Sequence, residues 1–86
     1  MQIKLFGNAD CQKCNALKLA FDQVGVGYDF IDAFADEHQA LCDAEGVDEI
    51  PHVQIIGPSG RIVYQQAGDV QVDTLFKIAK LVERKG

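Results

Sequence analysis

Cysteine and basic residues are scarce in this sequence. Its 86 residues include three cysteines, and eight lysines and arginines stand against 13 aspartates and glutamates, which gives a formal net charge of −5. A chain with so few basic residues lacks the positive face that phosphate binding requires, so nucleic acid is excluded as its main partner. Three cysteines are also too few for a secreted domain held together by disulfides.

Long hydrophobic runs are absent as well. No segment approaches the roughly 18 consecutive apolar residues of a membrane span. Lys4, Asn8, Asp10 and Lys13 interrupt the first apolar stretch, so the N-terminus does not resemble a signal peptide. We therefore expect a cytoplasmic protein that does not bind membranes. In a reducing compartment, a close pair of cysteines is more often catalytic or metal-binding than structural.

The periodicity of the apolar residues predicts a single domain, residues 1–86, built from strands and helices. Alternation predicts strands at 2–6, 28–32, 52–56 and 61–66, and helical spacing predicts helices at 11–24, 36–45 and 70–85. Gly25 and Gly27 are expected to end the first helix, and Gly46 is expected to end the second. The predicted buried helix faces comprise Cys14, Leu17, Ala20, Phe21 and Val24, then Leu41, Cys42 and Ala44, then Leu75, Phe76, Ala79 and Val82.

This order of elements constrains the architecture. The first strand, helix and strand require a crossover, so the two strands run parallel with the helix on one face of the sheet. The turn GPSG joins the last two strands as an antiparallel hairpin. The result is an α/β fold of order βαβαββα, with a four-stranded mixed sheet and three helices on its two faces. Reactive groups in such sheets collect at the carboxyl ends of parallel strands, where Cys11 lies.

The motif Cys11-Gln12-Lys13-Cys14 opens the first predicted helix. Unpaired backbone N–H groups at a helix N-terminus favour the thiolate, which is the attacking form of cysteine. Cys14 follows one turn later on roughly the same face, so the two sulfurs can approach each other. This spacing suits thiol–disulfide exchange, in which Cys11 attacks a target disulfide and Cys14 resolves the mixed disulfide. Lys13 favours the thiolate, and Asp10 opposes it.

With these features the sequence resembles the thioredoxin/glutaredoxin superfamily over nearly its whole length. The run CQKCNALKLAFDQVGVGYDFID is similar to glutaredoxins, and the length of the hairpin is similar to that of thioredoxins. The segment GVDEIPHVQI resembles the one that carries the superfamily's cis-proline, here Pro51. The resemblance implies the thioredoxin fold. It also implies that Ile50 lies beside the cysteines with its backbone available to pair with an extended substrate.

The sequence departs from both branches of the superfamily. Asp10 stands where thioredoxins usually have tryptophan, and Leu5 occupies the position of their buried acid. For glutathione binding, glutaredoxins carry Thr-Val-Pro and Gly-Gly-x-Asp segments, whereas this chain has Glu-Ile-Pro and, loosely, Ala-Gly-Asp. The carboxylate of Glu49 weakens the case for this anionic tripeptide. Gly68 and Asp69 could still offer backbone N–H groups at the start of the last helix, or Asp69 could simply be its N-cap.

Two metal-binding alternatives stay open at this stage. Cys11, Cys14, His38 and Cys42 offer the ligand types of a structural zinc site, and Cys11 could hold a cluster between two chains, as in some glutaredoxins. The long gap and the strand between the two pairs of residues disfavour the zinc site, whereas the sequence leaves the cluster open. Cys42 is then a buried apolar residue and His38 a surface residue. His52, after Pro51, is either a strand surface residue or a contributor to partner choice.

The sequence therefore predicts a small thiol–disulfide oxidoreductase that reduces protein disulfides as a monomer, with no bound cofactor or metal. The catalytic residues are Cys11 and Cys14, and the residues expected to contact the substrate are Gln12, Lys13, Ile50, Pro51 and Gly68. Electrons would come from a thioredoxin reductase or, in the glutaredoxin alternative, from glutathione as a co-substrate. The alternative from a different class is a redox-inactive binding module.

Overall fold

The computed structural model describes the chain path of residues 2–85 and the side chains of residues 2–77 and 80. The elements follow in the order β1 (Gln2–Gly7), α1 (Gln12–Val24), β2 (Asp29–Asp32), the short 3-10 helix η1 (Asp36–His38), α2 (Gln39–Glu45), β3 (His52–Ile56), β4 (Ile62–Ala67) and α3 (Val72–Lys85). The strands form one mixed sheet in the order β2-β1-β3-β4, in which only β1 and β2 run parallel. The predicted architecture is confirmed.

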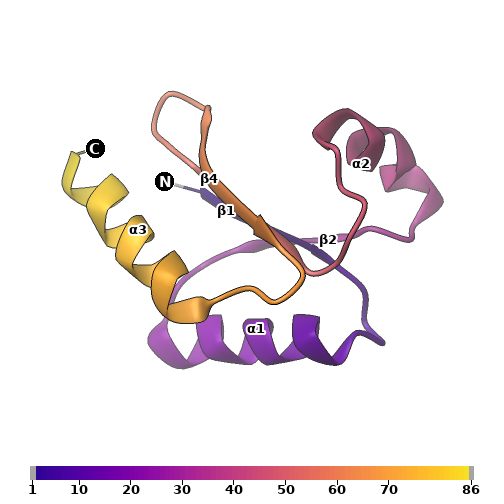
Figure 1. Cartoon of the computed structure of the whole chain (residues 1–86), viewed down its shortest axis with the longest axis horizontal. Coiled ribbons are helices and arrows are strands. Elements are labelled where there is room, and N and C mark those ends of the chain that lie inside the picture. The colour runs from indigo at the N-terminus through magenta and orange to yellow at the C-terminus, as the bar shows by residue number, and fades with distance from the viewer. Residues whose placement is uncertain (1, 86) are drawn as a thin grey trace.

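The helices cover the two faces of the sheet unequally (Figure 1). α1 and α3 lie on one face, where the core consists of Ile3, Leu5, Leu17, Phe21, Val53, Ile55 and Leu75. Phe21 is at its centre, with ring centroids 5.1 Å from Tyr28 and 5.8 Å from Phe76. The predicted inner face of α1 is correct for Cys14, Leu17 and Phe21, but Val24 is 55% exposed. After the turn at residue 25, Val26 packs against the core instead.

α2 lies on the other face of the sheet and covers less of it (Figure 1). Cys42 is its one buried residue, whereas Leu41 is half-buried and Ala44 is exposed, so the predicted inner face was only partly correct. A helix of seven residues makes barely two turns, which leaves room for little more than one inward position. Gly25 and Gly46 end α1 and α2 in the left-handed conformation, as predicted, whereas Gly27 lies beyond the end of α1 and does not adopt that conformation.

α3 begins later than the sequence predicted. Val70 donates its backbone N–H to the Gly68 carbonyl, and Gln71 donates its own to the side chain of Gln66. The chain therefore makes a turn before the helix starts at Val72, and Asp69 is not its N-cap. Ala79 and Val82 of the predicted inner face lie outside the described side chains. No helix in the described part of the chain is long and apolar enough to cross a membrane.

Candidate active site

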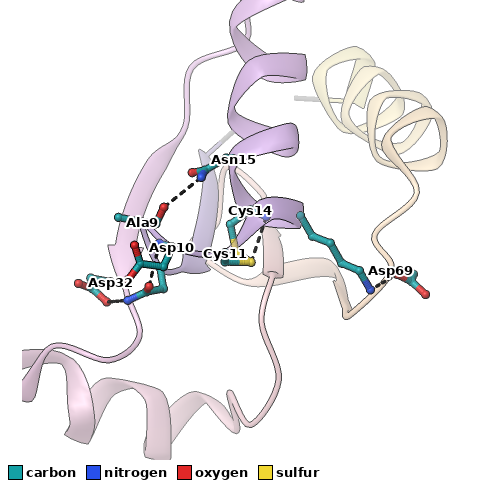
Figure 2. The surroundings of a disulfide bond; sticks show 9 residues. Ala9, Asp10, Cys11, Cys14, Asn15, Asp32 and Asp69 are labelled. Atoms are coloured by element: carbon teal, nitrogen blue, oxygen red, sulfur yellow. Dashed lines mark hydrogen bonds and ion pairs between the residues drawn. A yellow bond between two sulfur atoms is a disulfide. The ribbon is translucent and has the colours of Figure 1, made fainter.

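Cys11 and Cys14 are joined by a disulfide at the N-terminus of α1, with their Cα atoms 5.2 Å apart (Figure 2). Cys11 is the N-cap residue of α1, and its Sγ accepts a hydrogen bond from the backbone N–H of Cys14 at 3.2 Å. Cys11 is half-exposed, whereas Cys14 is completely buried. A partner can therefore reach Cys11 first, and the helix N-terminus favours a thiolate at that position.

Asn8 holds the loop that presents Cys11. Its side-chain oxygen accepts the Asp10 backbone N–H at 2.9 Å, and its amide nitrogen donates to the Asp32 carboxylate at 3.3 Å. Its backbone carbonyl accepts the Cys11 N–H at 3.1 Å. Sequence reasoning missed this residue. The signal was present in the Asn-x-Asp pattern, which is typical of turns in which an asparagine side chain bonds to the backbone two residues later.

Replacing Asn8 with alanine should loosen this loop. Asn8→Ala removes two side-chain hydrogen bonds from a half-buried residue, so we expect the free energy of unfolding to fall by about 1–2 kcal/mol in urea denaturation. Asn15→Ala is the matched control, because the exposed Asn15 side chain makes one hydrogen bond, to the Ala9 carbonyl. An equal loss in both variants would contradict the role of Asn8.

The peptide bond between Ile50 and Pro51 is cis, as the resemblance implied. Pro51 is buried, and its carbonyl accepts the Gly68 N–H at 2.9 Å. His52 pairs with Phe6 across the β1–β3 ladder, so the cis bond and the loop after β1 lie at the same end of the sheet. Ile50 is half-buried, and within the described part of the chain its backbone N–H and carbonyl have no partner.

Gly68 does not offer the backbone N–H that the sequence suggested for a ligand. That N–H is bonded to Pro51, and the Gly68 carbonyl accepts the Val70 N–H at 3.0 Å. A β carbon at Gly68 would lie 2.6 Å from Oε1 of Glu49, so the Glu49 carboxylate rests directly on this glycine. Gly68 therefore contributes a close approach between two loops, with no free donor for an anion.

Lys13 and Asp69 form an ion pair that joins the start of α1 to the loop before α3 (Figure 2). Both side chains are exposed, as is that of Gln12. The hydrogen bond and the charge of Lys13 lower the pKa of Asp69 from its ordinary 3.8. The same contacts with Asp69, aided by the charge of Glu49, raise the pKa of Lys13 above 10.5. The sequence indicated both residues but not their pairing.

The pairing of Lys13 with Asp69 predicts a specific pH dependence. The contribution of this ion pair to folding stability is present above pH 3.8 and is lost as the pH falls through the lowered pKa of Asp69. At the alkaline end it is present below pH 10.5 and is lost as the pH rises through the raised pKa of Lys13. By NMR, the Asp69 carboxyl should titrate below 3.8 and return toward that value in Lys13→Gln or in strong salt. An unchanged midpoint in Lys13→Gln would contradict the pair.

His52 is buried rather than exposed, so its interpretation as a surface residue was wrong. It is 7% exposed, its ring packs edge-on against Phe6 with centroids 5.8 Å apart, and Nε2 lies 2.9 Å from the Gln65 side-chain oxygen. Its Nδ1 is buried without a partner in the described part of the chain. β3 lies between two strands, and all five of its residues are buried, so no position in it is a surface position.

The candidate zinc ligands are not gathered into a site. Cys42 is buried, as predicted, with its Sγ 3.8 Å from the Ala33 carbonyl. His38 is half-buried, and its Nδ1 lies 2.8 Å from the Asp32 carbonyl. Among the described residues, no three histidine, cysteine or acidic side chains come together in a way that could hold a metal ion.

Several solved structures share this arrangement. Thioredoxin 1 from Thermosipho africanus superposes with a TM-score of 0.76 at 19% identity, and the match covers 99% of this chain and 98% of that one. The chain has the thioredoxin fold. A mutant thioredoxin from Halobacterium salinarum superposes with a TM-score of 0.78 at 24% identity, and the match covers 93% of this chain and 72% of that one. The glutaredoxin-like NrdH-redoxin from Escherichia coli superposes with a TM-score of 0.66 at 24% identity, and the match covers 91% of this chain and 95% of that one.

No protein-family model matches this sequence, and no curated protein matches it either. The thioredoxin fold that the resemblance implied is thus confirmed. Within that fold, Cys11 and Cys14 lie at disulfide distance and the cis-proline loop lies at the same end of the sheet.

Proposed function

We propose that this protein is a thiol–disulfide oxidoreductase that reduces disulfides in partner proteins. The observation that carries the proposal is the cysteine pair itself, with the half-exposed Cys11 capping α1 and the buried Cys14 one turn further on. The proposal includes residues 1–86 acting as one domain, as a cytoplasmic monomer and without a resident cofactor. Cys11 is the nucleophile, and Cys14 is the resolving thiol.

The reaction consists of two exchange steps. The Cys11 thiolate attacks one sulfur of the substrate disulfide, forms a mixed disulfide and releases the other substrate sulfur as a thiolate. The Cys14 thiolate then attacks the Cys11 sulfur, which releases the second substrate thiolate and closes the disulfide between Cys11 and Cys14. Two electrons pass to the substrate, whose thiolates take up protons. A separate reductant restores the two cysteine thiols.

The substrate is proposed to bind as an extended segment along Ile50. The unpaired backbone groups of Ile50 support this mode, because a segment can add to them by main-chain hydrogen bonds, as a strand adds to a sheet edge. The cis bond to Pro51 places these groups at the same end of the sheet as Cys11. The exposed Gln12 and Lys13 lie between the two cysteines and complete the contact surface.

A protein reductase is the proposed electron source, and glutathione is the alternative. The engaged N–H of Gly68 and the nearby Glu49 carboxylate both disfavour an anionic tripeptide. Two neighbours point the same way. NrdH-redoxin is described as glutaredoxin-like with a thioredoxin-like activity profile, and thioredoxin f2 has been solved in complex with ferredoxin:thioredoxin reductase.

Insulin reduction tests the proposal and separates the two electron sources. The protein would be supplied with NADPH and either a thioredoxin reductase or glutathione with its reductase, and turbidity would report the reduced insulin. We expect activity with thioredoxin reductase and little with glutathione. Activity with glutathione alone would favour the glutaredoxin alternative. Failure of the dithiothreitol-reduced protein to reduce insulin would contradict the oxidoreductase and favour a redox-inactive binding module.

A further inference from the structure

A small groove opens beside the disulfide, between the start of α1 and the loop that leads into α3. Its volume is about 190 Å³, and Leu17, Pro51, Val70 and Val72 supply apolar parts of its lining. This is room for an aliphatic side chain. Because Pro51 follows Ile50 directly, a segment that pairs with the Ile50 backbone lies within reach of the groove.

The charges that line this groove balance, and a further carboxylate lies next to it. The ammonium group of Lys13 is paired with Asp69. The Glu49 carboxylate does not line the groove but rests on Gly68, which does, and its charge helps to raise the pKa of Lys13. Glu49 is exposed and makes no hydrogen bond or ion pair within the described part of the chain. Two carboxylates therefore share a single ammonium group, and the carboxylate of Glu49 is the one left to meet a ligand.

Further carboxylates surround the disulfide. Asp10 precedes Cys11 and is exposed. Asp32 lies near Asp10, and the Asn8 side chain bonds to both residues (Figure 2). Asp48, next to Glu49, is exposed as well. The formal net charge of −5 also favours positively charged partners over negatively charged ones. Fields of this kind raise association rates of oppositely charged partners by roughly 10- to 1,000-fold.

We propose that the groove selects a substrate segment that carries an aliphatic side chain and one or two basic residues beside its disulfide. This inference rests on the proposed oxidoreductase function and defines the substrate class of the same site. The aliphatic side chain enters the groove between Leu17 and Val70. The basic side chain pairs with Glu49, while Lys13 stays paired with Asp69. Segments with acidic residues beside the disulfide are repelled.

Two cyclic peptides test the proposal. Each contains one internal disulfide and a leucine, and they differ only in having two lysines or two glutamates next to the cysteines. The second-order rate of oxidation of the reduced protein would be followed by acid quenching and separation of the two redox forms. Each rate would be divided by that of the same peptide with dithiothreitol, because flanking charges also change the intrinsic reactivity of a disulfide.

We expect the normalised rate to be about tenfold higher for the lysine peptide at low salt, and the ratio to shrink in 0.5 M sodium chloride. Glu49→Gln should slow the lysine peptide by roughly three- to tenfold and speed up the glutamate peptide. Asp22→Asn is the matched control. This variant also removes one negative charge from an exposed residue, but Asp22 lies about 15 Å along α1 from its first residue, Gln12. It should leave the ratio of the two peptide rates unchanged.

The outcomes separate this inference from the function on which it rests. If both peptides oxidise the protein at equal normalised rates, or if Glu49→Gln and Asp22→Asn behave alike, the charge selection is overturned and the oxidoreductase stands. If neither peptide oxidises the reduced protein although both react with dithiothreitol, the proposed function fails together with the inference. Replacing the leucine with glycine should slow the lysine peptide several-fold, and an unchanged rate would remove the groove from the proposal.

Discussion

Cys11→Ser is expected to abolish disulfide reduction, with the rate falling by more than about 1,000-fold. The hydroxyl that replaces the sulfur cannot attack a disulfide at neutral pH, and the buried Cys14 cannot take its place because a partner does not reach it. Cys14→Ser should behave differently. Attack by Cys11 still occurs, but the mixed disulfide is not resolved, so mass spectrometry should detect a covalent adduct with the substrate protein.

Cys42→Ala is the matched control for these variants. Cys42 is buried on the face of the sheet covered by α2 and takes no part in the proposed exchange. The variant should keep nearly full activity and form no adduct. Full activity of Cys11→Ser would refute the assignment of the nucleophile, and an adduct through residue 11 that formed equally in the wild type would refute the role of Cys14.

Gly7→Ala is expected to lower the free energy of unfolding by about 1–3 kcal/mol. A β carbon at position 7 would lie 2.7 Å from Sγ and 3.1 Å from Cβ of Cys14, and 3.3 Å from Cε2 of Phe30. Gly7 is the last residue of β1 and is buried, so the added methyl group has no open space to occupy. The start of α1 must move away from the sheet, which disturbs the disulfide directly.

Gly27→Ala makes the same chemical change without the same contacts. No atom lies within 4 Å of a β carbon at Gly27, and its backbone conformation suits an ordinary residue. Its free energy of unfolding should stay the same or rise by roughly 0.4–1 kcal/mol. Urea denaturation of both variants provides the comparison. If Gly7→Ala is as stable as Gly27→Ala, the close packing of Cys14 on β1 is wrong.

Local sequence signals were sufficient to predict the strand-to-helix junction. Cys11 follows a short strand and opens a helix whose inward positions recur at helical spacing, and this pattern depends only on neighbouring residues. The same holds for Gly25 and Gly46, which end their helices as expected. For Pro51, the resemblance to a known superfamily supplied what periodicity did not, namely the cis bond.

The features that the sequence did not reveal depend on contacts between distant segments. Lys13 and Asp69 are 56 residues apart, so their pairing follows from how α3 enters the fold. The surface alternative for His52 was wrong because alternation assumes a strand with one exposed face, whereas β3 is enclosed on both faces and between two strands. Asp69 was predicted to precede a helix that starts at residue 70. The turn in which Val70 bonds to Gly68 delays the start of α3 to Val72.

The position of β1 and β3 in the middle of the sheet has a consequence for motion. Both loops of the site leave from these two inner strands, whose hydrophobic residues are almost entirely enclosed. Amide protons in such strands exchange with solvent mainly when the whole domain opens. The cysteine loop and the cis-proline loop are therefore attached to the strands expected to exchange most slowly, and exchange should be faster in the edge strands β2 and β4.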